Sequence, residues 1–248
     1  MKKVNSDVAY DYVRRRILSG EYAPGKALMT ESIAKDIKIS RTPVRDALRK
    51  LETDGLVTIR AHLGASVKQM HLKEFREMCD LRLALESHAA GLAAVNHSEN
   101  DLREIHYALE AMRRLTGEII AAPQEKPLLG ELAQEDVRFH IAIMMAAKNE
   151  LMKKEILRLH LINRLMTTPA SIPTQVMPKT ESDARRRAVL AMHDNIYNAI
   201  ARSDAVAAKH EMEFHLQELI ERTLFLLSRA ESGVIARELT AEELAYNS

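Results

Sequence analysis

Apolar residues recur every three or four positions along most of this chain, which is the spacing of an amphipathic helix. Near the N-terminus the pattern predicts helices over residues 6–19 and 40–54. A shorter helix follows Thr30 and lies between them in the sequence. The pair Pro24-Gly25 marks a turn after the first helix, because both residues interrupt helical periodicity.

The pattern then changes to short segments typical of strands. Residues 56–59 and 65–68 predict two strands, and Gly64 supplies the turn between them. Short helices followed by a two-stranded hairpin are the element order of a winged helix-turn-helix.

From residue 72 the pattern is helical almost to the end of the chain, and no strand signal follows residue 70. Pro123 and Pro127 bracket one predicted loop, and Pro169, Pro173 and Pro178 lie in another, because proline disrupts a helix interior. The helices are expected over residues 72–96, 99–121, 131–147, 150–167, 181–202 and 204–231. This part is predicted to be an all-α antiparallel helical bundle.

The fold expected from these elements is mainly α, with two domains. Residues 1–69 form a winged-helix DNA-binding domain in this interpretation, and residues 70–231 form a helical effector- and metal-binding domain. Residues 232–248 are expected to be a last helix or a tail.

Composition excludes several classes of protein. Apolar residues make up 46% of the chain and charged residues 29%, which suits a core with a solvated surface. Cys79 is the only cysteine, so a disulfide scaffold is excluded. No apolar run approaches the ~20 residues that span a bilayer, and no signal-peptide core follows Met1. We therefore expect a soluble cytoplasmic protein with no membrane partner.

The near-neutral net charge of +1 conceals an uneven distribution. Residues 1–68 hold 14 Lys and Arg against 8 Asp and Glu, a net of +6, and the remainder carries a net of −5. A basic small half joined to an acidic large half favours a module that binds a polyanion. Ordinary fluctuation remains an alternative for a segment of this length.

The predicted helix that opens at Ser40 has the side chains needed to read duplex DNA. Arg41, Arg45 and Arg49 are four apart and share one helix face, and an arginine can donate two hydrogen bonds to guanine. Ser40 and Thr42 are candidates for phosphate contact or capping. The hairpin tip, with His62 and Gly64, would reach the adjacent minor groove or backbone. A solvated basic face is the alternative interpretation.

The N-terminal residues resemble the DNA-binding domain of the GntR family over about residues 8–69. The matching stretches are Ile17-Leu18-Ser19-Gly20, Pro24-Gly25, Ser40-Arg41-Thr42-Pro43-Val44-Arg45-Asp46-Ala47-Leu48 and Asp54-Gly55-Leu56-Val57. Two departures concern the turn and the wing. Ile37-Lys38-Ile39 stands where the family usually has a turn glycine, and Leu63 stands where a basic wing residue commonly precedes the glycine. His62 is then the candidate wing contact.

Residues 72–230 resemble the FCD ligand-binding domain of the FadR-type branch of that family. The resemblance rests on Arg82, Leu85-Glu86, Asp136, Phe139-His140, Asn149, His193, Ile196, Asp204, Met212 and His215-Leu216. Many members of that branch bind a divalent metal through an Asp and three His. The resemblance therefore implies a metal site formed by Asp136, His140, His193 and His215, and an organic-acid or sugar-acid effector.

Physical chemistry is compatible with this implied site. Asp136 and His140 are i,i+4 and point from one side of a helix. One carboxylate with three imidazoles suits Zn, Ni, Co, Fe or Mn and leaves a divalent ion with a formal charge of +1. A small carboxylate could fill the open coordination positions, with Arg82 as a second anchor. The alternative for Arg82 is a salt bridge with Asp80 or Glu86. The other histidines, including His160, are interpreted as surface or hydrogen-bonded residues.

These observations predict a homodimeric transcriptional regulator. Repression is the commoner outcome in the family that the chain resembles, so we expect a repressor. It would bind a double-stranded DNA operator with an affinity controlled by a small organic acid bound at the divalent metal. Two alternatives remain open from the sequence: the same regulator with a metal-free pocket for an acyl ligand, and a metal-dependent enzyme. The enzyme interpretation gives no reason for the DNA-reading pattern of residues 8–69.

Overall fold

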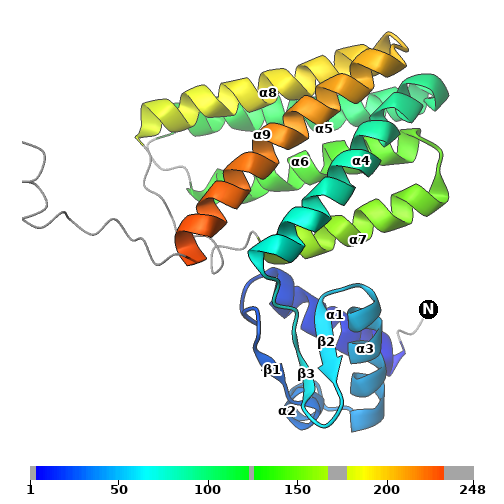
Figure 1. The fold of residues 1–248 in the computed structure, drawn as a ribbon, viewed down its shortest axis with the longest axis vertical. Helices are drawn as coiled ribbons and strands as arrows, with labels where there is room; N and C mark the ends of the chain where they lie inside the picture. Colours follow the sequence, from blue (N-terminus) through cyan, green and yellow to red (C-terminus); the bar gives the residue numbers. More distant parts are fainter. Residues whose placement is uncertain (1–3, 123–125, 167–177, 232–248) are drawn as a thin grey trace, which may run out of the picture.

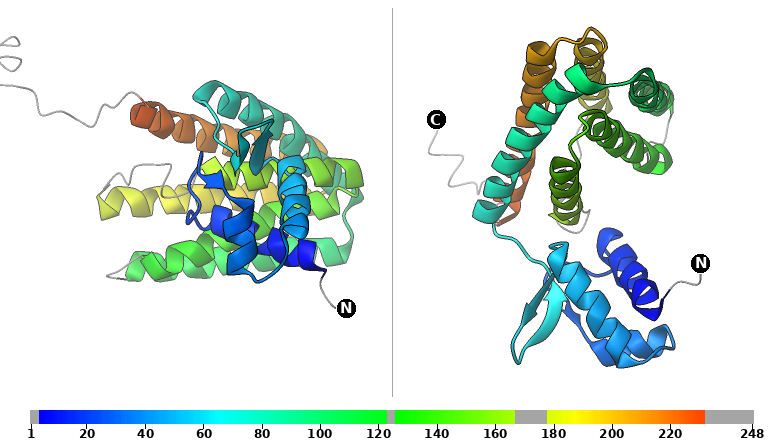
Figure 2. Two further views of the ribbon diagram at one scale, coloured as in Figure 1. Left: turned by 90° about the horizontal axis from the view of Figure 1, so that it is seen from below. Right: turned by 90° about the vertical axis from the view of Figure 1, so that its right-hand side faces the viewer.

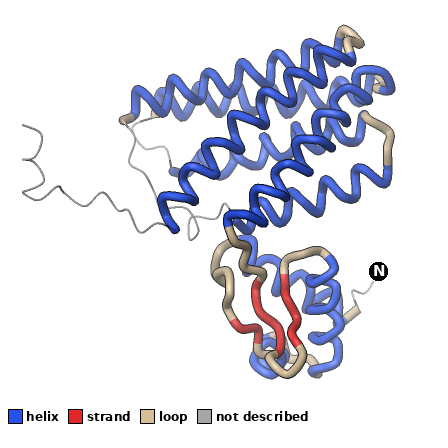
Figure 3. The backbone as a smooth tube through the Cα atoms, viewed as in Figure 1, coloured by secondary structure: helices blue, strands red, loops and turns tan. Residues whose placement is uncertain are grey.

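The chain is described by a computed structural model that covers residues 4–122, 126–166 and 178–231. Figure 1 shows a small N-terminal unit that contains all the strands found among the described residues. This unit packs against one end of a group of long helices. The tube drawing in Figure 3 makes the same division by secondary structure. The expected fold class, a winged helix-turn-helix followed by a helical domain, is confirmed.

The N-terminal unit has the winged-helix order of elements. Its elements are α1 (Asn5–Leu18), β1 (Ala27–Leu28), α2 (Thr30–Asp36), α3 (Arg41–Thr53), β2 (Val57–Arg60) and β3 (Gly64–Val67). The strands form an antiparallel sheet in the order β1-β3-β2, in which Ser66 pairs with Ala27 on one side and with Thr58 on the other. The core is apolar and is formed around Val13, Ile17, Val44, Leu51 and Leu56, which are fully buried.

The sheet differs from the predicted hairpin in two respects. It has a third strand, β1, which the hydrophobic pattern did not indicate because Ala27 and Leu28 are too short a segment to show alternation. The predicted strands are also displaced, since β2 covers 57–60 instead of 56–59 and β3 covers 64–67 instead of 65–68. Gly64 therefore begins β3, with a positive φ of 82°, instead of lying in the turn.

The second unit consists of long helices. They are α4 (Leu72–Asn96), α5 (Glu99–Ala121), α6 (Lys126–Ala146), α7 (Glu150–Met166), α8 (Lys179–Ala201) and α9 (Ala205–Glu231). The right-hand view in Figure 2 shows these helices grouped above the winged helix. Their shared core includes the small residues of α4, which allow close helix packing: Ala89, Ala90, Ala93 and Ala94.

The ends of the helices follow local chemistry. The Ser98 hydroxyl accepts a hydrogen bond from Asp101 N, and the Asp101 carboxylate accepts one from Ser98 N at 2.8 Å, which forms a capping box at α5. Helix α6 begins at Lys126, so the prediction that Pro127 lies in a loop was wrong. A proline in a first turn is tolerated because the N–H that it lacks would have no partner in the helix. Pro169, Pro173 and residues 232–248 lie outside the described residues.

The two units meet at the C-terminal end of α7. Leu165 of α7 is fully buried within the core cluster of the winged helix, and Leu161 packs against the same cluster. Ile162 joins a separate cluster with Phe75 and Met78 of α4. Helix α7 therefore contacts both units through neighbouring turns. Within the described residues, no helix is long and apolar enough to cross a membrane.

Candidate DNA-reading surface and candidate metal centre

Helix α3 has two faces of opposite character. One face is fully or almost fully buried and consists of Val44, Ala47, Leu48 and Leu51. The opposite face carries the predicted DNA-reading arginines, Arg41, Arg45 and Arg49, all of which are exposed. The buried face fixes the helix on the winged-helix core and leaves the basic face directed away from it.

The three arginines differ in their partners. The Arg41 guanidinium donates to Glu31 Oε1 of α2 at 2.8 Å, and Arg49 lies 4.0 Å from Asp46. Arg45 has no ion pair among the described residues. Arg45 is therefore the arginine whose donors are available without breaking an existing salt bridge.

The turn before α3 contains the departure noted in the sequence. Lys38 adopts a left-handed backbone conformation with φ 55°, which a glycine would adopt without strain. Ser40 precedes α3 as its N-cap residue, but its side chain makes no capping hydrogen bond, and Thr42 lies in the first turn. Both side chains are exposed next to Arg41.

The wing ends in an exposed tip between β2 and β3. His62 has φ 63°, and the backbone of Gly64 is open, with no heavy atom within 4 Å of the position of a Cβ. Leu63 is 79% exposed, which makes the tip partly apolar. The tip thus presents His62 beside an exposed leucine.

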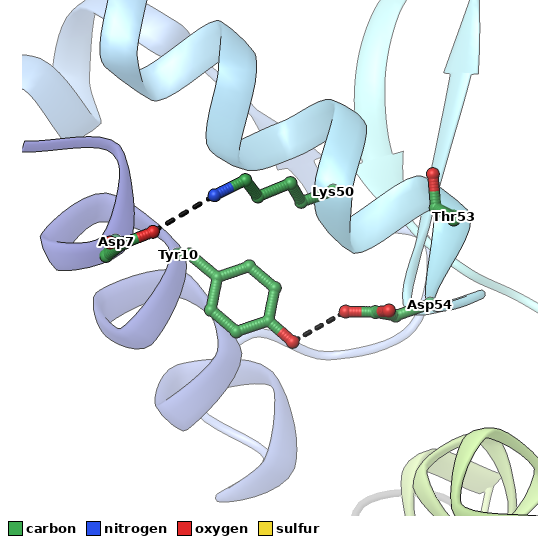
Figure 4. A pocket seen from close by; sticks show the side chains of 5 residues that line it. All are labelled: Asp7, Tyr10, Lys50, Thr53 and Asp54. Atoms are coloured by element: carbon green, nitrogen blue, oxygen red, sulfur yellow. Dashed lines mark hydrogen bonds and ion pairs between the residues drawn. The ribbon is translucent and has the colours of Figure 1, made fainter. Parts of the chain in front are cut away.

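A pocket of about 390 Å³ lies between α1 and the end of α3. Figure 4 shows that its side chains bridge the two helices: Tyr10 donates to Asp54 at 2.5 Å, and Lys50 donates to Asp7 at 3.0 Å. Burial, reinforced by the bond to Asp54, raises the pKa of Tyr10 to about 12. Because its polar groups already pair with one another, we interpret the pocket as a brace between α1 and α3.

The three histidines of the predicted metal site converge from three helices of the second unit, and Asp136, whose side chain is 37% exposed, approaches one of them, His193. Asp136 and His140 lie on α6, His193 on α8 and His215 on α9. The imidazole centroids are 4.4 Å apart for His193 and His215, 5.2 Å for His140 and His215, and 5.7 Å for His140 and His193. One potential ligand atom from each histidine lies within 4.8 Å of the others. All three histidines are buried.

The hydrogen bonding of His193 leaves one ring nitrogen directed at Asp136. His193 Nδ1 lies 2.8 Å from the carbonyl oxygen of Val189, which can only accept, so Nδ1 carries the proton. Nε2 of the neutral ring then holds a lone pair, 3.1 Å from the Asp136 carboxylate. Two such acceptors repel unless a proton or another cation lies between them.

A second pair of nitrogens also needs a proton or another cation between them if both hold lone pairs. His140 Nε2 and His215 Nε2 are 3.2 Å apart, and His140 Nδ1 lies 3.3 Å from the Glu86 carboxylate. A proton on His140 Nδ1 therefore leaves its Nε2 as a lone pair facing the other imidazoles. A carboxylate behind a histidine in this way orients the ring and fixes its tautomer for metal binding.

The electrostatics of the cluster differ from one histidine to another. Burial lowers the pKa of His215 well below its ordinary value, and the adjacent His193 and His140 lower it further. Burial opposes ionisation of Asp136, but the imidazoles nevertheless hold its pKa well below its ordinary value. The cluster thus combines an ionised carboxylate with one imidazole, His215, that resists protonation, whereas Glu86 and Asp136 outweigh burial and raise the pKa of His140. These residues fit a divalent metal.

A buried group on the far side of His140 was missed by sequence reasoning. Glu86 of α4 is 1% exposed; its Oε1 accepts from Arg82 Nε at 2.8 Å, and its Oε2 lies 3.1 Å from His160 Nε2 of α7. Arg82 therefore forms the salt bridge with Glu86, one of its two predicted alternatives. His160 lies beside a carboxylate partner, which is compatible with its interpretation as a surface or hydrogen-bonded residue. Only the i,i+4 spacing of Arg82 and Glu86 hinted at this group.

A winged helix with an arginine-bearing recognition helix, joined to a helical domain with a buried polar centre, defines a DNA-binding transcriptional regulator. Comparison with known families gives the particular family. Residues 5–67 match the bacterial regulatory proteins of the gntR family, and residues 77–218 match the FCD domain. The chain belongs to the GntR family, in the branch that carries an FCD domain.

Individual relatives agree with this assignment. The chain is 28% identical to the HTH-type transcriptional regulator LutR of Bacillus subtilis, over 81% of this chain and 92% of LutR. It is 27% identical to the HTH-type transcriptional repressor RspR of Escherichia coli, over 88% of each chain. The structure of E. coli McbR/YncC has the same fold, with a TM-score of 0.67 at 19% identity, over 89% of this chain and 97% of that one. The relatives are regulators, so the chain is not interpreted as an enzyme.

Proposed function

We propose that this regulator holds a divalent metal through Asp136, His140, His193 and His215, and that a small organic carboxylate bound at the metal controls its affinity for operator DNA. The observation that carries the proposal is the buried meeting of His140, His193 and His215, with ring nitrogens facing one another and Asp136. A metal replaces these unfavourable contacts between acceptors by bonds to a single cation.

The chemistry of the effector follows from charge. One carboxylate and three neutral imidazoles leave a divalent ion with a net charge of +1, and four protein ligands leave positions open on a five- or six-coordinate ion. A small carboxylate fills such positions and neutralises the site. The donor set suits Zn, Ni, Co, Fe or Mn and does not choose among them.

The proposed role of Arg82 as an effector anchor is limited by its burial and by its salt bridge with Glu86. The side chain is 3% exposed, and its Nε already donates to Glu86. An effector carboxylate that reaches this guanidinium must share it with Glu86. We therefore propose Arg82 as an anchor only for a ligand that extends beyond the metal into the space beside α4.

At the DNA, the proposed contacts are those of the α3 face and the wing. Arg41, Arg45 and Arg49 would meet base edges or phosphates in the major groove, Ser40 and Thr42 the phosphates, and His62 with the Gly64 backbone the adjacent groove. A homodimer would place two such surfaces on two half-sites. RspR is named a repressor, which supports repression as the outcome of binding. Such a protein acts at the chromosome, so its proposed location is the cytoplasm.

A metal-free version of the same regulator remains the alternative. In that version the helical domain would hold an organic acyl ligand directly, and the histidines would be its hydrogen-bond partners. The paired acceptors at His193 and Asp136 favour the metal version, because an acyl chain supplies no cation between them.

Metal analysis of the purified protein tests the proposal. The wild-type chain is stripped with a chelator, incubated with zinc or nickel and analysed by native mass spectrometry, beside His193→Ala and the control His210→Ala. His210 is an exposed histidine on the same helix as His215. We expect wild type and His210→Ala to retain one ion per chain through dialysis, and His193→Ala to lose it.

Two results would contradict the metal centre. Metal at well below one ion per chain in the wild type would favour the metal-free pocket. Equal retention by His193→Ala would place the ion elsewhere in the molecule.

A further inference from the structure

A single buried carboxylate connects the candidate metal centre with the helix that docks on the winged helix. Glu86 Oε2 lies 3.3 Å from Nδ1 of His140, a proposed metal ligand, and 3.1 Å from Nε2 of His160 on α7. Glu86 Oε2 therefore lies within 3.3 Å of both imidazoles, although neither contact has hydrogen-bond geometry and these three buried atoms have no hydrogen-bond partner among the described residues. No other carboxylate among the described residues approaches two of these histidines in this way.

This group is not itself interpreted as a second metal site. Glu86, His140 and His160 have the spacing of metal ligands. However, the Arg82 guanidinium already supplies a cation to Glu86 at 2.8 Å, with both side chains almost fully buried. A further divalent ion would lie close to a buried arginine, which Coulomb repulsion disfavours.

Helix α7 continues directly from His160 into the winged helix. Leu165 is fully buried in the winged-helix core, and Leu161 packs against that core. Ile162 faces Gly55, two residues after the end of α3, so closely that a Cβ at Gly55 would lie 2.7 Å from Ile162 Cδ1. His160 therefore lies within two turns of residues that fix the position of the recognition helix.

We infer that Glu86 and His160 form the link through which occupancy of the metal centre sets the docking of α7, and hence of the recognition helix, on the FCD domain. This inference rests on the proposed metal centre. A metal on His140 Nε2 makes the Nδ1–H a stronger donor to Glu86 and fixes that ring. Glu86 is thereby held beside His160 Nε2, 3.1 Å away in this structure, and α7 is held against the winged helix.

Hydrogen–deuterium exchange of the full chain, with and without zinc, tests the link independently of any DNA or effector. In the wild type, zinc should slow exchange in residues 158–166 of α7 and in residues 51–57 around Gly55 by about fivefold or more, the lower range of allosteric coupling. Residues 105–112 of α5 report stabilisation of the bundle itself.

The variants His160→Leu and His160→Gln separate the link from a simple packing role. Leucine removes the donor to Glu86, whereas glutamine retains one. Zinc should still bind His160→Leu and slow exchange in α5, but the response at residues 51–57 should disappear. His160→Gln should restore much of that response, and the exposed His88→Gln should behave as wild type.

Three outcomes would overturn the inference, and they are distinguishable. Zinc bound to the wild type with no change at residues 51–57 would contradict the link alone. A full response at residues 51–57 in His160→Leu would also contradict it and assign the coupling to apolar packing. Failure of zinc to bind at all, measured by competition with a chelator, would contradict the proposed metal centre as well.

Discussion

At the scale of single residues, the arginines of α3 share one face but start from different states. Arg41 must leave Glu31 to contact DNA, whereas Arg45 has no ion pair among the described residues. A surface salt bridge contributes little to stability, so both arginines remain available, but the cost of binding is lower for Arg45. We therefore expect Arg45 to be the principal base-reading residue.

The variant Arg45→Ala tests this role. With a duplex selected by the wild-type protein from a random-sequence pool, we expect specific binding to weaken by ~1–3 kcal/mol, and binding to unrelated duplex to weaken less. Fluorescence anisotropy at fixed salt measures both affinities. Arg114→Ala, an exposed arginine on α5, is the control for the change in charge. Equal losses on both duplexes would reassign Arg45 to phosphate contact.

The left-handed Lys38 gives a second prediction at this scale. Lys38→Gly should raise the free energy of unfolding by about 1 kcal/mol, because glycine adopts φ 55° without a clash of Cβ. Denaturant unfolding measures the change. Lys35→Gly, in α2, is the matched control and should lower stability by about 1 kcal/mol. A loss of stability in Lys38→Gly would mean that its side chain contributes more than its backbone strain costs.

The residues of the metal centre and the residues behind it differ in how far the sequence could predict them. Asp136 and His140 share a helix and a spacing, and the family resemblance supplies His193 and His215. The meeting of Glu86 with His160 had no such signal, because the two residues lie on separate helices and approach each other only through packing. Periodicity reports which face of a helix is apolar, and it contains no information about which polar residues of different helices approach one another.

At the scale of elements, the long helices could be predicted from the sequence, whereas the short strand β1 and the first turn of α6 could not. Helices of several turns repeat their apolar spacing often enough to be recognised, whereas β1 has two residues and is defined by its hydrogen bonds to β3. The start of α6 was missed because proline was taken to exclude a helix, although it is tolerated in the first turn.

The junction between α3, β2 and α7 yields a prediction at this scale. Gly55 has φ 78°, and an added Cβ would lie 2.7 Å from Ile162 Cδ1. Gly55→Ala should therefore destabilise the protein by ~1–3 kcal/mol through backbone strain and overpacking. In the Ile162→Val background, which removes Cδ1, part of that cost should be recovered.

Denaturant unfolding of the four proteins in this double-mutant cycle measures the coupling. A coupling energy near zero would show that α7 does not press on Gly55 in solution. The backbone strain of alanine at position 55 remains in the double variant, so Ile162→Val does not recover that part of the lost free energy of unfolding.

At the scale of the whole molecule, a continuous series of packed elements joins the DNA-reading unit to the buried polar centre. The recognition helix is fixed on the winged-helix core, that core receives Leu165 of α7, and α7 carries His160 beside Glu86. The sequence indicated the two units separately through the change of pattern near residue 70. It did not indicate α7 as the helix between them, because a buried leucine looks the same whichever core receives it.

The central claim is that occupancy of the centre changes how the protein binds DNA. The most direct test is an anisotropy titration of the selected duplex with metal-free protein, with zinc-loaded protein, and with zinc-loaded protein in acetate, lactate, citrate or gluconate. We expect the wild-type affinity to differ by about fivefold or more between at least two of these states, and His193→Ala to show one affinity in all of them. The same affinity for wild-type protein in every state, with zinc bound, would contradict the account.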